Sequence, residues 1–153
     1  PRGSAHQGLQ EYQAPVEYGR SEIIRKGKKI AVLGVGSMIP SCMEICKGLK
    51  DDGYDPTFVN ARFVKPLDVD LLDELAKDHS LFVTVEENVK SGGYGEHVSA
   101  YMEACHPEIR VLSAAVWDRF VPQGNVESLR SRIGLGVEDI RQAIEDSEEL
   151  REQ

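Results

Sequence analysis

Short apolar runs and amphipathic segments take turns along most of this chain, and that alternation is the feature that most constrains its fold. The runs typical of strands are 21–25, 29–35, 56–63, 81–85 and 109–114, and the helical patterns are 40–53, 69–77, 96–106, 125–134 and from 137 onward. Strands that alternate with helices form a mostly parallel sheet with right-handed crossovers. We therefore predict a three-layer α/β fold, an open sheet of about five strands with helices on both faces, whose first strand can pair antiparallel at an edge.

The sequence predicts a single folded domain over residues 21–148. A chain of 153 residues with 41% hydrophobic content is long enough to bury a core of its own. Residues 1–20 contain three glycines and two prolines with little periodicity, so we interpret them as a linker. The acidic end, 149–153, is predicted to be a frayed tail.

Charge and cysteine content exclude several classes of protein. A formal net charge of −8 and scattered basic residues argue against a nucleic-acid partner, and no apolar run is long enough to cross a membrane. The three cysteines form no even disulfide framework, so we predict a cytoplasmic protein with reduced thiols. Cys42 and Cys46 lie on one face of a predicted helix and are interpreted as core residues, not metal ligands.

The segment Asn60-Ala61-Arg62-Phe63-Val64-Lys65-Pro66-Leu67-Asp68 joins a predicted strand to a predicted helix. Asp68 is suited to cap that helix. Arg62 and Lys65 are thereby placed at the carboxyl edge of the sheet, where open α/β folds bind ligands and partners. Two cations at this edge fit either a ligand site or an interface.

Two further groups of side chains follow predicted strands. Glu86 and Glu87 are adjacent and therefore point to opposite faces, so we expect one to face outward and the other to accept hydrogen bonds from a loop or neighbour. Trp117, Arg119 and Phe120 are residue types of a contact surface, or they cover the domain's own core. No nucleophile stands beside a base, so we assign no catalytic residue and no metal ligand.

Two other features have competing interpretations. The turn Gly34-Val35-Gly36-Ser37 follows a strand as a dinucleotide fingerprint does, but Ile39 replaces the third glycine, which favours a tight turn over a nucleotide site. His6, His79 and His106 fall in loop-like contexts and are predicted to be exposed.

Taken together, the motifs resemble one family. The segments 60–68 (NARFVKPLD), 84–88 (TVEEN) with 92–95 (GGYG), and 118–124 (DRFVPQG) are similar to the carboxy-terminal domain of the 1-deoxy-D-xylulose-5-phosphate synthase family. The wider transketolase family, including the beta subunits of 2-oxoacid dehydrogenases, shares the fold and a looser form of the first two motifs. Trp117 departs from the pattern, which has a Leu-Pro or similar pair before the aspartate.

The resemblance implies a three-domain, homodimeric enzyme that uses thiamine diphosphate and magnesium to join a two-carbon unit from pyruvate to glyceraldehyde 3-phosphate. The cofactor lies between the first two domains, so the resemblance implies that this third domain binds no cofactor and is inactive alone. Its expected role is contact with the preceding domains and with the second subunit. The residues assigned to these contacts are Arg62, Lys65, Glu86, Glu87, Trp117, Arg119 and Phe120.

One residue near the start of the chain is an exception. Pro1-Arg2-Gly3 resembles the end of the family's middle, pyrimidine-binding domain, whose arginine is expected to bind the acceptor's phosphate in the intact enzyme. On this interpretation residues 1–20 include a remnant of that domain. The alternative for the first four residues is a protease-site scar from an expression tag. The alternatives for the whole chain are a fragment of a 2-oxoacid dehydrogenase beta subunit and a free-standing nucleotide-binding module.

Overall fold

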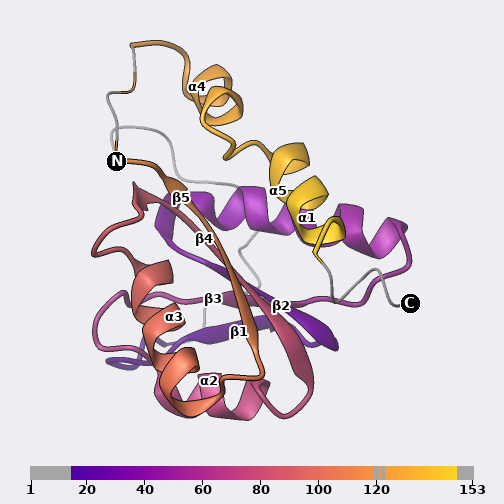
Figure 1. Cartoon of the computed structure of the whole chain (residues 1–153), viewed down its shortest axis with the longest axis vertical. Coiled ribbons are helices and arrows are strands. Elements are labelled where there is room, and N and C mark those ends of the chain that lie inside the picture. The colour runs from indigo at the N-terminus through magenta and orange to yellow at the C-terminus, as the bar shows by residue number, and fades with distance from the viewer. Residues whose placement is uncertain (1–14, 119–120, 122, 148–153) are drawn as a thin grey trace.

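The computed structural model describes residues 15–118, 121 and 123–147 and shows one sheet between helices (Figure 1). The strands are β1 (Glu22–Arg25), β2 (Lys29–Gly34), β3 (Thr57–Asn60), β4 (His79–Val89) and β5 (Arg110–Val116). The helices are a short 3-10 turn, η1 (Gly36–Met38), and α1 (Ile39–Asp51), α2 (Val69–Leu75), α3 (Tyr94–Cys105), α4 (Val126–Arg132) and α5 (Val137–Glu145).

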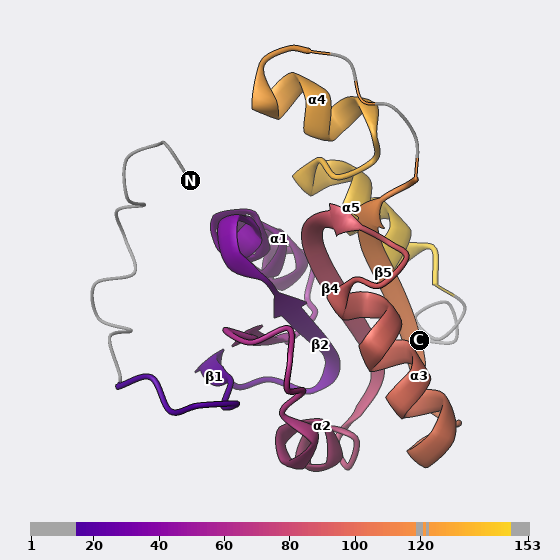
Figure 2. The same cartoon turned by 90° about the vertical axis from the view of Figure 1, so that its left-hand side faces the viewer.

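The strand order is β1-β3-β2-β4-β5, and all neighbouring strands pair in parallel except β1, which runs antiparallel to β3 at an edge. Figure 2 shows the sheet from β1 on one side to β5 on the other. This order confirms the predicted three-layer α/β fold with an antiparallel edge strand. The fold was predictable because alternating strands and helices leave few other arrangements.

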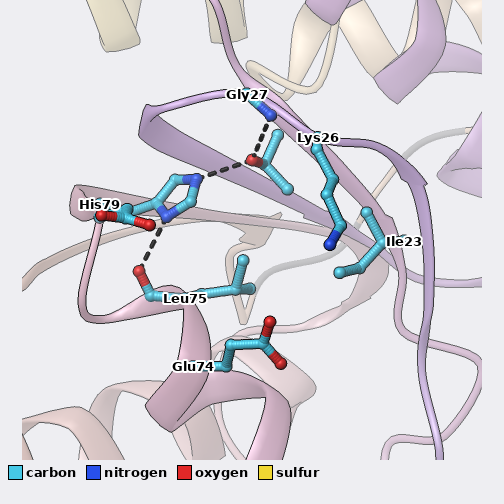
Figure 3. A pocket seen from close by; sticks show the side chains of 8 residues that line it. Ile23, Lys26, Gly27, Glu74, Leu75 and His79 are labelled. Atoms are coloured by element: carbon cyan, nitrogen blue, oxygen red, sulfur yellow. Dashed lines mark hydrogen bonds between the residues drawn. The ribbon is translucent and has the colours of Figure 1, made fainter.

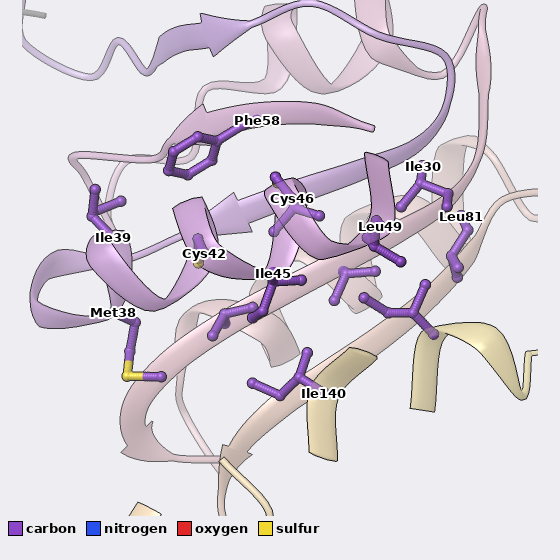
Figure 4. Close-up of a cluster of buried hydrophobic side chains, with 14 of the residues drawn as sticks. Ile30, Met38, Ile39, Cys42, Ile45, Cys46, Leu49, Phe58, Leu81 and Ile140 are labelled. Atoms are coloured by element: carbon purple, nitrogen blue, oxygen red, sulfur yellow. The ribbon is translucent and has the colours of Figure 1, made fainter. Parts of the chain in front are cut away.

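The sheet has a hydrophobic cluster on each face. One cluster lies under α1 and α5 and includes Cys42, Cys46, Leu49 and Ile140 (Figure 4), and the other lies under α2 and α3. Burial raises the pKa of both thiols, that of Cys46 to about 12. Both cysteines are therefore protonated core residues near neutral pH, as the helical spacing predicts.

Strand β3 is shorter than the sequence predicts. The expected strand reached residue 63, but β3 ends at Asn60 because Arg62 takes a left-handed backbone conformation with φ of 57°. Such a conformation is uncommon outside glycine and ends an extended run. The prediction beyond Asn60 was wrong, and the residues that follow form a loop instead.

His79 is buried, so its predicted exposure was wrong. Only 6% of the residue is exposed, and it begins β4, two residues before the predicted start of that strand. Its Nδ1 donates to the carbonyl of Leu75 at 2.8 Å, and its Nε2 lies 2.7 Å from the hydroxyl of Thr57, which also accepts from the Gly27 amide (Figure 3). Both ring nitrogens have partners, which is what allows a polar ring to be buried there.

His106 is also less exposed than predicted. Its side chain is 23% exposed, and its Nε2 lies 2.7 Å from Oδ1 of Asp73 on α2. Tyr101 of α3 donates to the same oxygen at 2.8 Å. Hydrogen bonds from His106 and Tyr101 hold the pKa of Asp73 below its usual range. This cluster fastens α2 to the end of α3, a contact that sequence position alone does not show.

Candidate functional site

The carboxyl ends of the parallel strands bring most of the predicted contact residues to one edge of the sheet. Arg62 follows β3, Glu86 and Glu87 lie near the end of β4, and Trp117 follows β5. This is the edge at which open α/β folds place ligands and partners. Arg2, Arg119 and Phe120 lie outside the described residues.

Glu86 is a buried carboxylate that organises the glycine-rich loop after β4. Only 1% of it is exposed, and its two oxygens accept hydrogen bonds from the amides of Tyr94 at 2.9 Å and Gly95 at 2.8 Å. These amides lie in the first turn of α3, where the helix dipole also favours a negative charge. A Cβ at Gly93 would stand 2.7 Å from a carboxylate oxygen of Glu86, so the loop wraps closely around this group.

Glu87 points the other way, as the alternation along a strand requires. Its carboxylate accepts from the hydroxyl of Ser37 at 2.6 Å and pairs with the guanidinium of Arg130 at 3.1 Å. Partial burial raises the pKa of Glu87, but hydrogen bonds from Arg130 and Ser37 outweigh it and hold this pKa below its usual range. Glu87 thus fastens α4, which buries none of its own residues, to the sheet.

The lowered pKa gives a pH-dependent prediction for Glu87→Gln. A carboxylate whose pKa is depressed by folding stabilises the protein above its unfolded pKa of about 4.3, and this stabilisation is lost as the pH falls through the folded pKa. At pH 7 we expect Glu87→Gln to lower the free energy of unfolding by less than about 1 kcal/mol, as for other exposed ion pairs. Urea unfolding of both proteins should show this difference shrinking toward zero between about pH 5 and pH 3. A difference that stays constant over that range would contradict the assignment.

Trp117 is the most prominent side chain at the edge. It is 57% exposed, and the ammonium of Lys90 lies 4.7 Å from the centre of its ring. Val89, 41% exposed, precedes Lys90, and the Lys90 amide donates to the carbonyl of Val116 at 2.8 Å. We call Val89, Lys90 and Trp117 the Trp117 surface. An exposed aromatic with an aliphatic and a cationic neighbour has the chemistry of a contact surface.

Arg62 and Lys65 have different surroundings. Arg62 pairs with Glu22 of the same chain at 2.6 Å, and both side chains are 13% exposed. Lys65 is exposed. The sequence left open whether Arg62 contacts its own domain, and this ion pair shows that it does. Contacts of either residue with a second subunit stay a prediction.

Asp68 caps α2 as predicted, since its Oδ1 accepts from the Leu71 amide at 3.4 Å. A second role was missed. Its Oδ2 accepts from the amide of Ser21 at 2.7 Å, and its Oδ1 pairs with Arg20 at 3.0 Å. The capping pattern signals the first role but not the second, because Arg20 and Ser21 are more than 40 residues away along the chain. The Glu87–Arg130 pair was missed for the same reason.

The turn after β2 is built for packing. A Cβ at Gly34 would stand 2.7 Å from Sγ of Cys42, so the residue must be small for α1 to lie against the sheet. Ser37 donates to the carboxylate of Glu87 at 2.6 Å. A carboxylate at this position repels phosphate, which disfavours the nucleotide-binding alternative.

The described residues contain neither a metal-ligand cluster nor a membrane-spanning helix. Within residues 15–118, 121 and 123–147, no group of three or more His, Cys, Asp or Glu side chains is placed so that it could hold a metal ion. Over the same part of the chain, every helix is too short or too polar to cross a membrane.

Comparisons with known proteins agree with the fold and the motifs. A family model described as the transketolase C-terminal domain matches residues 19–140. The 1-deoxy-D-xylulose-5-phosphate synthase of Lachnoclostridium phytofermentans is 38% identical over 92% of this chain, and that of Nitrosomonas europaea is 39% identical over 95%. The chain spans 23% of the length of each of these relatives.

Solved structures give the same answer for the fold. A split-gene transketolase, solved as an inactive tetramer described as 'beta4', superposes with a TM-score of 0.83 and 28% identity. The match covers 96% of this chain and 47% of that one. A transketolase from Campylobacter jejuni shares the fold at a TM-score of 0.58 and 18% identity, covering 84% of this chain and 19% of that one. The chain belongs to the transketolase C-terminal domain family.

Proposed function

We propose that this chain is the C-terminal domain of a thiamine-diphosphate-dependent 1-deoxy-D-xylulose-5-phosphate synthase. The intact enzyme would condense pyruvate with glyceraldehyde 3-phosphate to give 1-deoxy-D-xylulose 5-phosphate and CO2 in the cytoplasm. The observation that carries this proposal is identity of 38–39% over 92–95% of the chain to synthases of this name. The sequences of segments 60–68 (NARFVKPLD) and 118–124 (DRFVPQG), which resemble the synthase in particular, support the same assignment.

Within that enzyme the domain, 21–148, would supply contacts and leave the chemistry to the preceding domains. Thiamine diphosphate and magnesium would be held by those domains, and Arg2 would bind the acceptor's phosphate. The contact residues would be Arg62, Lys65, Glu86, Glu87, Trp117, Arg119 and Phe120, with Glu86 acting from beneath the surface. The exposed Trp117 surface supports this role, because large exposed side chains next to a well-fixed loop suit a partner surface.

The reaction is tested with the intact protein that contains this chain. Purified with thiamine diphosphate and magnesium and supplied with pyruvate and glyceraldehyde 3-phosphate, it should release one CO2 for each 1-deoxy-D-xylulose 5-phosphate detected by mass spectrometry. Transfer of the two-carbon unit to a lipoyl acceptor, with no sugar phosphate formed, would instead indicate a 2-oxoacid dehydrogenase.

The contact role predicts an assembly defect for Trp117→Ala in the intact protein. An exposed aromatic at the centre of an interface commonly contributes about 2 kcal/mol or more to association. We therefore expect the dimer dissociation constant, measured by sedimentation equilibrium, to rise at least about tenfold. Val126→Ala is the control, since Val126 is similarly exposed, at 54%, but lies on α4 and not in the Trp117 surface. An unchanged dissociation constant in Trp117→Ala would remove the Trp117 surface from the dimer contact.

A further inference from the structure

Two large apolar side chains are exposed on the segment that leads into the domain. Val16 is 67% exposed and Tyr18 is 82% exposed. Both residues precede the part of the chain that matches the family model, which begins at residue 19. They therefore lie at the junction between this domain and any part of the intact protein before it.

The backbone under these side chains is fixed at several points to the loop 60–68. Ser21 donates from its amide to Asp68 at 2.7 Å and from its hydroxyl to the Ala61 carbonyl at 3.1 Å. Arg20 pairs with Asp68 at 3.0 Å and with Asp70 at 2.6 Å. Most of these groups belong to the loop that carries the family motif.

Arg62 adds a largely buried contact to the same attachment. Its guanidinium pairs with Glu22 at 2.6 Å and donates to the Pro15 carbonyl at 3.4 Å. The ring of Phe63 meets the ring of Tyr18 edge to face at 5.6 Å. Contacts to Pro15, Tyr18 and Glu22 span the whole described entering segment.

The backbone of Arg62 is itself unusual. Its φ of 57° lies in the left-handed region, and its amide donates to the side chain of Asn60 at 3.2 Å. A left-handed backbone costs a non-glycine residue free energy, so it persists only where neighbouring contacts hold it. The left-handed turn is where the chain leaves β3 and where the guanidinium of Arg62 meets Glu22.

We propose that the loop 60–68 is a latch for residues 15–22, and that the latched segment presents Val16 and Tyr18 as a docking surface for the preceding part of the intact protein. This inference rests on the proposed function, which supplies preceding domains. A latched segment holds the preceding part on a short tether, so its effective concentration is high and a small apolar surface is enough to bind it. Fixing the segment beforehand also lowers the entropy lost on docking.

The latch is tested in this chain with Arg62→Asn. Asparagine tolerates a left-handed backbone, so the turn is kept while the contacts with Glu22 and Pro15 are lost. Hydrogen exchange of the Arg20 and Ser21 amides, which donate to the Glu17 carbonyl and to Asp68, should become about tenfold faster, because local opening becomes easier, while the melting temperature changes little. Lys65→Asn, an exposed change in the same loop, is the control and should leave exchange unchanged. Unchanged exchange in Arg62→Asn would overturn the latch.

The docking surface is tested in the intact protein with the double variant Val16→Ser and Tyr18→Ser. Trypsin cleavage after Arg20 should become about tenfold faster, because undocking exposes the segment. The oligomeric state should not change. Unchanged cleavage would overturn the docking surface, and dissociation into monomers would also overturn it by showing that a second subunit covers these residues. Synthase activity of the unmodified intact protein is measured separately, so failure of the proposed function is recognised on its own.

Discussion

Glu86→Ala is expected to be the most destabilising substitution considered for this domain. It leaves the amides of Tyr94 and Gly95 buried without their carboxylate acceptor. Each unsatisfied buried donor costs about 1–3 kcal/mol, and the lost side chain leaves a cavity. We expect the free energy of unfolding to fall by about 3–5 kcal/mol, which corresponds to a melting temperature lower by about 10 °C in circular dichroism.

Two further variants test whether the lost carboxylate acceptor at the start of α3 causes this result. Glu86→Gln keeps one acceptor oxygen but loses the negative charge at the start of α3, so its effect should be about half as large. Glu87→Ala, one residue away and facing outward, should cost less than about 1 kcal/mol. Similar losses in Glu86→Ala and Glu87→Ala would contradict the role given to Glu86. Glu86→Gln also provides a measurable protein if Glu86→Ala does not fold.

Gly95→Ala is expected to have the second largest effect. An added Cβ would stand 2.3 Å from Oγ of Ser113 and 2.5 Å from Oγ1 of Thr84, so α3 would have to move away from β4 and β5. Overpacking of this kind costs about 1–3 kcal/mol, and we expect a value near the upper end, about 3 kcal/mol, because both contacts are far below normal separation. Chemical denaturation with urea measures the loss.

A second substitution tests whether the clash is the cause. The Ser113 hydroxyl is buried and has no hydrogen-bond partner among the described residues, so Ser113→Ala alone should be neutral or slightly stabilising. Combined with Gly95→Ala it should recover part of the loss, since one of the two clashing oxygens is gone. Gly124→Ala is the control, because a Cβ there meets Leu129 only at an ordinary 3.4 Å. An equal loss in Gly95→Ala with and without Ser113→Ala would contradict a direct clash.

The order of elements and the fold were predictable because each depends on short-range patterns. The apolar run 30–33 and the helical spacing of Cys42, Ile45, Cys46 and Leu49 identify their elements locally, and the alternation then limits the topology. That Glu86 and Glu87 point to opposite faces follows from the two-residue period of a strand, although the sequence does not say which of them points inward. These features needed no knowledge of distant contacts.

The features that were missed depend on contacts between distant parts of the chain. The end of β3 at Asn60 reflects a left-handed Arg62 whose partner, Glu22, is 40 residues earlier. The burial of His79 depends on Thr57 in a neighbouring strand, and the attachment of α4 depends on Glu87 meeting Arg130. Local propensity contains none of this information, because tertiary contacts decide it.

We expect this domain to contribute contacts and to bind no cofactor. Isothermal titration calorimetry of this chain with thiamine diphosphate and magnesium tests this expectation most directly, with the intact protein titrated under the same conditions as the positive control. We expect saturable binding to the intact protein and no saturable heat with this chain. Saturable binding of thiamine diphosphate to this chain alone, with a micromolar dissociation constant, would contradict it.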